Sequence, residues 1–197
     1  MSDSRAIIEQ APLQDRDLLQ RLSLYFDGFD ARLKQGQGWF IFNAKHARSG
    51  RIATFIQHRL TEYRPMVSYY FVPWRDFALS SYVQEVGLAS LRPKAEGVAV
   101  DKASREYELA SRLTRDTYAQ MHSTELLILV GLKPAHRHEA LSLDRMIDGR
   151  YQRRLATILL TPDMPQELEA EFESLDPTRT VWERVFQRMY ETSLVAL

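Results

Sequence analysis

The chain has 197 residues, with 26 lysines and arginines against 26 aspartates and glutamates, five histidines and no cysteine. This length is close to the ~150 residues of an average domain and predicts one domain with a core that needs no cross-links. The absence of cysteine excludes a disulfide scaffold, a thiolate metal site and a cysteine nucleophile. The formal net charge of zero argues against a protein that coats nucleic acid with its whole surface.

The apolar segments are too short for a membrane span. The longest apolar runs have about six residues, whereas a membrane-spanning helix requires ~20. The first ten residues include acidic side chains and lack the apolar stretch of a secretory signal. We therefore expect a cytoplasmic protein that has no membrane partner.

Five short apolar runs alternate with helix-like segments along the chain. Each run has the length of a strand, is rich in β-branched or aromatic residues and shows little period-two alternation, which is typical of strands buried on both faces. The runs are residues 39–42, 67–72, 126–130, 156–161 and 193–197.

The segments between these runs repeat apolar side chains at helical spacing. The clearest helical faces cover residues 52–63, 103–121, 143–151 and 181–189. Strands that alternate with helices of this size predict βαβ units and a mostly parallel sheet. We therefore expect a three-layer α/β domain over residues 38–197, with a five-stranded sheet flanked by helices.

Two segments lie outside this alternation. Residues 1–37 are expected to form a helical extension with room for one helix, because apolar side chains recur at helical spacing from Leu18 to Leu33. That helix would end near Gly36, before the turn into the first strand. Residues 87–100 contain a proline and a glycine and have no sustained period, so we expect a long mobile loop there.

The turn after the first expected strand is where ligands bind in parallel α/β folds. Four basic or potentially basic side chains lie there, just ahead of an amphipathic stretch: Lys45, His46, Arg48 and Arg51. The unpaired N–H groups and the dipole at the start of a helix favour anions. These residues are candidates for binding a phosphate of nucleic acid or of a nucleotide. The alternative is a loop whose charges are simply solvated.

Several segments, taken in order, resemble the DnaC/IstB-type helicase loaders, a branch of the AAA+ ATPases. Residues 40–60 resemble their first strand, phosphate-binding loop and helix. Residues 126–129 resemble the Walker B strand, and residues 144–161 the helix and strand that lead to sensor 1. Residues 183–189 (ERVFQRM) are similar to the helix that carries the family's trans-acting arginine. The resemblance covers roughly residues 35–197 and implies a P-loop, AAA+-like fold.

This chain departs from the family at the residues that phosphoryl transfer requires. In place of the two glycines, the lysine and the Ser/Thr of GxxxxGK[ST] it has Ala44, Ser49, Gly50 and Arg51. The Walker B acids correspond to Val130 and Gly131, and the sensor-1 asparagine is replaced by the turn 161–163. Losing a phosphate clamp and a metal site removes several kcal/mol of transition-state stabilisation. We therefore predict a pseudo-ATPase that has no catalytic residues, metal or cofactor.

The same resemblance makes Arg184 and Arg188 candidates for contact with a partner. Arg184 matches the family's arginine that enters the ATP site of a neighbouring subunit. The alternative is that both arginines, four residues apart on an amphipathic helix, pair with Glu183 or Glu191 at the surface.

Two further groups of residues are candidates for functional sites. His136 and His138 form an HxH pattern beside Glu139, but the sequence offers no third metal ligand, so we expect a surface loop. Aromatic side chains around the first two strands are suited to stacking on single-stranded bases, but packing in the core is the favoured interpretation. These aromatic residues are Trp39, Tyr69, Tyr70, Phe71 and Trp74.

These observations predict a catalytically inactive AAA+-like subunit that functions in DNA replication, transposition or mobile-element maintenance. Its expected partner is an active AAA+ ATPase or a helicase, or further copies of itself. The alternative is a protein that binds single-stranded DNA or RNA directly through residues 45–51, with an affinity that falls steeply as salt rises.

Overall fold

A computed structural model of the protein describes residues 2–63, 66–86 and 115–197. The elements are, in order, α1 (Ser2–Gln10), α2 (Leu13–Asp27), α3 (Phe29–Lys34), β1 (Gly38–Ile41), α4 (His46–Glu62), β2 (Tyr69–Pro73), α5 (Trp74–Val86), β3 (Leu126–Val130), α7 (Arg137–Gln152), β4 (Ala156–Leu160), α8 (Pro165–Leu175), α9 (Thr180–Thr192) and β5 (Ser193–Ala196). A further helical stretch covers residues 115–123.

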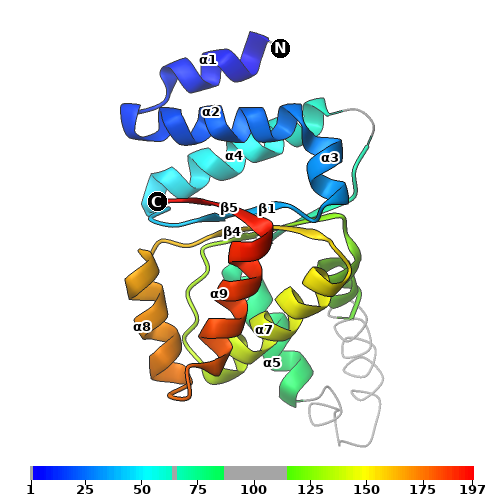
Figure 1. Cartoon of the computed structure of the whole chain (residues 1–197), viewed down its shortest axis with the longest axis vertical. Helices are drawn as coiled ribbons and strands as arrows, with labels where there is room; N and C mark the ends of the chain where they lie inside the picture. The colour runs from blue at the N-terminus through cyan, green and yellow to red at the C-terminus, as the bar shows by residue number, and fades with distance from the viewer. Residues whose placement is uncertain (1, 64–65, 87–114) are drawn as a thin grey trace, which may run out of the picture.

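The five strands form one parallel sheet in the order β2-β3-β4-β1-β5. Helices α2 and α4 cover one face of the sheet, with α1 packed on them from outside, and α5, α7, α8 and α9 cover the other face (Figure 1). Each strand returns to the sheet through helical segments, as the alternating sequence pattern predicts. The predicted three-layer α/β domain with a parallel five-stranded sheet is therefore confirmed.

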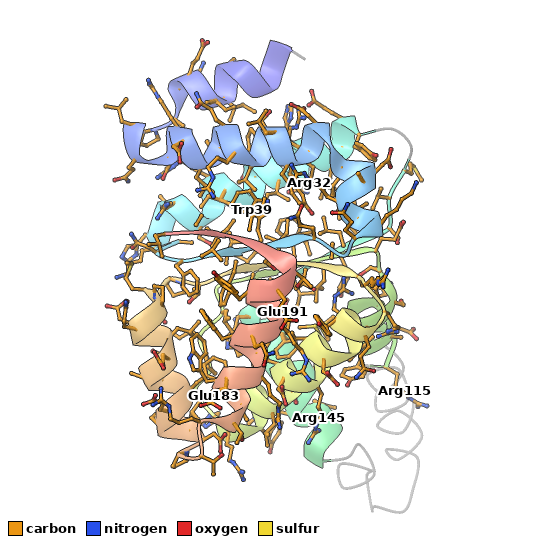
Figure 2. All side chains as sticks on the ribbon, viewed as in Figure 1. Arg32, Trp39, Arg115, Arg145, Glu183 and Glu191 are labelled. Carbon is orange, nitrogen blue, oxygen red and sulfur yellow. The ribbon has the colours of Figure 1, made fainter. Side chains whose placement is uncertain are left out.

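Each face of the sheet has its own hydrophobic core, because successive side chains of a strand point to opposite faces. On β1, Trp39 and Ile41 join the core beneath α2 and α4, whereas Phe40 joins the core shared with α7 and α9. Figure 2 shows Trp39 between the sheet and the helices that cover it. The three inner strands are almost wholly buried, which explains their continuous apolar runs. The edge strand β2 is not: Tyr69 is 38% exposed.

The N-terminal extension contains three helices rather than the one expected. Gly28 separates α2 from α3, and α1 precedes both. The extension packs on the sheet through aromatic side chains, since the rings of Tyr25 and Trp39 lie edge to face with their centroids 6.1 Å apart. The Tyr25 hydroxyl also donates a hydrogen bond to the Gln37 carbonyl at 2.7 Å. The extension therefore shares a core with the α/β domain.

Parts of the sequence prediction lie outside the described residues. The expected loop at 87–100 lies wholly outside them. The expected helix at 103–121 lies outside them as far as residue 114. The described end of that segment, residues 115–121, is helical as predicted. None of the helices that the structure describes is both long and apolar enough to cross a membrane.

Arg150, near the end of α7, is 1% exposed and holds the amino-terminal edge of the sheet together. Its guanidinium donates to the Thr157 hydroxyl at 2.9 Å and to the backbone carbonyls of Met121, Thr124 and Ala156 at 2.6–3.0 Å. None of these acceptors is a carboxylate, so the charge is stabilised by dipoles alone. Burial, with a smaller contribution from Arg153, lowers the pKa of Arg150 to about 9.

We expect Arg150→Ala to lower the free energy of unfolding by ~3–5 kcal/mol, because it leaves buried acceptors without a donor and opens a cavity. The matched control is Arg145→Ala, which removes an exposed arginine from the same helix and should change the stability little (Figure 2). Urea denaturation followed by circular dichroism measures both variants. Equal losses from the two would contradict this account of Arg150.

Candidate functional site

The carboxyl ends of the five parallel strands meet at one edge of the sheet, where ligands bind in open α/β folds. The turn between β1 and α4, the start of α8 and the end of β5 all lie at this edge, on the left of Figure 1. The predicted anion-binding residues 45–51 belong to this turn and to the first turns of α4.

The turn after β1 is too short to form a phosphate-binding loop. Helix α4 already begins at His46, so the residues that correspond to most of the P-loop are helical. The amides of Asn43 and Ala44 donate to the carbonyls of Asp163 and Thr161 at 3.0 and 2.8 Å, and that of Arg48 donates to the Lys45 carbonyl at 3.0 Å. These N–H groups therefore do not point at a shared anion. The backbone makes the tight turn with positive φ at Asn43 and His46, at 53° and 45°.

Two of the four predicted basic residues converge on one buried carboxylate. Asp15, from the first turn of α2, is 0% exposed. Its Oδ2 accepts hydrogen bonds from Nε and Nη2 of Arg51 at 2.9 and 2.6 Å, and its Oδ1 lies 3.0 Å from Nε of Arg48. Arg48 also donates to the carbonyl oxygens of Asn43 at 2.9 Å and Leu197 at 3.2 Å. The pair of arginines thus connects α4 to α2, to its own turn and to the end of β5.

The other two basic residues lie apart from this cluster. Lys45 Nζ is 3.8 Å from a carboxylate oxygen of Glu167 on α8, and both side chains are about half exposed. His46 is exposed. The structure therefore does not gather the four predicted residues around one point.

The loops after β3 and β4 carry a further pair of charges that the sequence analysis did not single out. Lys133 Nζ lies 2.9 Å from Glu171 and 3.4 Å from Asp163. The hydrogen bond to Glu171 and the charge of Asp163 raise the pKa of Lys133. Lys133 follows shortly after Val130 and Gly131, the positions that correspond to the Walker B acids. Among the described residues, no three metal-ligating side chains come together.

Arg184 and Arg188 pair with acids on α7, not with Glu183 or Glu191. Arg184 donates to both oxygens of Asp144, and this hydrogen bonding raises the pKa of Arg184. Arg188 Nη2 lies 2.6 Å from Asp148, and its Nη1 lies 3.7 Å from Asp144. The paired residues are four apart on each helix and follow the same order along the chain. Helices α7 and α9 therefore run side by side in the same direction. Arg184 remains 48% exposed.

His136 and His138 border a surface cavity of about 600 Å³ between α5 and the start of α7. Their rings stack with centroids 5.5 Å apart, and His138 also contacts the ring of Tyr82 at 5.7 Å. Of the aromatic residues considered for base stacking, Trp39 is fully buried and Trp74 is 8% exposed, which fits core packing. Tyr69, Tyr70 and Phe71 lie on the edge strand β2.

No protein-family model matches the chain, and no curated protein matches it in sequence. Solved structures match it in fold. The chain has a TM-score of 0.61 to the DnaC helicase loader, with 13% identity over 95% of this chain and 92% of that one. It has a TM-score of 0.54 to AMPPCP-bound DnaA from Aquifex aeolicus, with 12% identity over 88% of this chain and 45% of that one. The chain therefore shares the fold that its resemblance to the helicase-loader type implied.

Asp176 fixes the start of α9 and with it the position of Arg184. Its carboxylate accepts hydrogen bonds from the hydroxyls of Thr178 and Thr180 and from the amide of Val181, at 2.8–3.2 Å. The bond from Thr178, supported by those from Val181 and Thr180, lowers the pKa of Asp176 below its ordinary 3.8. The ionised form therefore stabilises the folded chain.

We expect Asp176→Ala to lower the free energy of unfolding by ~1–2 kcal/mol at pH 7, as the loss of a helix cap does. A lowered pKa adds stability above pH 3.8, and this stability is lost as the pH falls through the folded value. The variant should therefore lose less stability than the wild type when the pH drops below ~4. Denaturation curves at several pH values measure this, with the exposed Asp116→Ala as control. A steeper acid loss in Asp176→Ala than in wild type would contradict it.

Proposed function

We propose that the protein is a catalytically inactive AAA+-like subunit that acts with an AAA+ ATPase or helicase in DNA replication or a related process, such as transposition or mobile-element maintenance. The observation that carries the proposal is the turn between β1 and α4. The amides of Asn43 and Ala44 donate to the loop after β4, and α4 begins at the residues that would otherwise curve around a phosphate.

The charges at the same edge of the sheet support an inactive site. A phosphoryl-transfer centre needs a lysine on the phosphates and acids that hold Mg²⁺. Arg51 stands at the Ser/Thr position and is bound to Asp15, and a lysine bound to α8 follows the Walker B strand. Gly50 stands where the lysine that clamps the phosphates would be, and Val130 and Gly131 stand where the acids that hold Mg²⁺ would be.

A role in binding a partner is supported by the surface of α9. Arg184 is half exposed, yet its guanidinium is held in one orientation by two bonds to Asp144. A pre-ordered arginine loses little side-chain entropy when it contacts a carboxylate or phosphate of another subunit. We propose that Arg184, with Arg188 beside it, forms part of the contact with the ATPase partner.

We expect the purified protein to show no Mg²⁺-dependent ATP hydrolysis above a blank without enzyme. When a tagged chain is recovered from its own cells, an AAA+ ATPase or helicase should co-purify equally with and without nuclease. The wild type should change that partner's ATPase rate, and Arg184→Ala should reduce the change at least ~10-fold, as expected for the loss of an interface arginine. Arg145→Ala is the matched control on α7. ATP turnover that Arg51→Ala abolishes would refute the proposal.

Direct binding of single-stranded nucleic acid through residues 45–51 is the second candidate, favoured by the exposure of Lys45 and His46 beside the start of α4. On this account, co-purifying proteins are lost with nuclease and the affinity for oligonucleotides falls steeply as salt rises. Lys45→Ala with His46→Ala should then weaken binding, whereas Arg145→Ala should not. Unchanged binding in the double variant would exclude this surface.

A further inference from the structure

The carboxylate of Asp15 and the guanidinium groups of Arg48 and Arg51 form a closed cluster between α2 and α4. Asp15 is 0% exposed, and the side chains of Arg48 and Arg51 are 11% and 36% exposed. Two guanidinium groups thus face one buried carboxylate. The cluster also lies at the first turns of two helices, α2 and α4, and neither helix has another acid in its first turn.

These surroundings are the ones that proteins use to bind oxyanions. Arginines present several N–H donors to a carboxylate or phosphate, and the start of a helix adds the positive end of its dipole. Here Asp15 Oδ2 accepts two hydrogen bonds from Arg51 at 2.6–2.9 Å, and Oδ1 lies 3.0 Å from Nε of Arg48 in an ion pair without a hydrogen bond between them. Arg48 is fixed in turn by carbonyls of the turn after β1 and of Leu197. The donors are therefore pre-ordered around an oxyanion that belongs to the chain itself.

We propose that Asp15 is a tethered oxyanion: it fills an oxyanion site at the start of α4 and excludes phosphate groups of nucleotides and nucleic acids from Arg48 and Arg51. A tethered group competes at a high effective concentration, which a free phosphate ester must exceed. Withdrawing Asp15 also requires α2 to move, and α2 is anchored by the buried Leu18, Leu19 and Leu22. The N-terminal helices thus keep the site closed in the folded protein. This inference concerns the isolated chain and does not depend on the proposed function.

A purely structural ion pair and a filled oxyanion site differ in one measurable respect. Removing the carboxylate destabilises the protein in both cases, but only an oxyanion site is refilled by a small anion of the right chemistry. The full chain with Asp15→Ala is therefore titrated with formate, and separately with inorganic phosphate, against chloride at equal ionic strength. Thermal unfolding followed by circular dichroism gives the midpoint temperature.

We expect Asp15→Ala to have a lower midpoint than the wild type, and formate to raise it saturably by at least ~4 °C more than chloride, as ligand binding to the folded state requires. Phosphate should act in the same way if the vacated space admits it, so the two anions distinguish a carboxylate-sized from a phosphate-sized site. The wild type should show no such difference between anions, because its site is filled.

The control on the same helix is Asp27→Ala, which removes a half-exposed carboxylate 2.6 Å from Arg59 and should show no anion-specific recovery. The double variant Asp15→Ala/Arg51→Gln should lose the recovery, because it lacks the main donor. If Asp15→Ala does not fold in chloride, the refolding yield in formate against chloride replaces the midpoint. Equal effects of formate, phosphate and chloride on Asp15→Ala would overturn the proposal.

Discussion

Strand β1 joins the two cores and the candidate site, and it enters the sheet at a point where only glycine fits. A side-chain carbon at Gly38 would lie 1.8 Å from the carbonyl oxygen of Thr157, far inside van der Waals contact. Gly38 therefore lets β1 lie flat against β4, with Trp39 opposite Ile158. This register sends Trp39 into one core and Phe40 into the other. It also brings the turn after β1 to the loops that follow β4, where Asp163 and Thr161 accept its amides.

At the carboxyl edge of the sheet, and between α7 and α9, charged side chains pair within the chain. Arg48 and Arg51 meet Asp15, Lys133 meets Glu171, and the arginines of α9 meet the acids of α7. Exposed pairs of this kind contribute little to stability, but the pair with Asp15 is buried and so costs much more to break. A chain of zero formal net charge thus has a buried ion pair at the edge of the sheet where open α/β folds bind ligands.

The sequence was sufficient to predict the elements with strong apolar patterns. The inner strands were found because they are buried on both faces, and α4, α7 and α9 because one face of each is apolar. Helices α5 and α8 were not identified. In α5 the apolar and polar side chains are not separated onto different faces. Helix α8 is short and carries many acidic side chains. The break at Gly28 was missed because the apolar period continues from α2 into α3.

The candidate residues were predictable, but their partners were not. Asp15 lies more than thirty residues before Arg48 in the sequence, within a segment whose pattern predicts only a helical extension. Likewise, Glu183 and Glu191 are the acids nearest to Arg184 and Arg188 along the chain, whereas Asp144 and Asp148 are the acids nearest in space. That choice is set by the parallel packing of α7 on α9. The spacing of residues along α9 cannot reveal which acids pair with its arginines, because the pairing depends on how β4 and α8 direct the chain between α7 and α9.

The turn after β1 also shows how the chain itself holds the junction between β1 and α4. In a working phosphate-binding loop, the anion holds the start of the helix against the strand through backbone N–H groups. Here the same junction is held by amides bound to the loop after β4 and by arginines bound to Asp15. Each contact is part of the folded chain, so groups of the chain itself hold the strand against the helix.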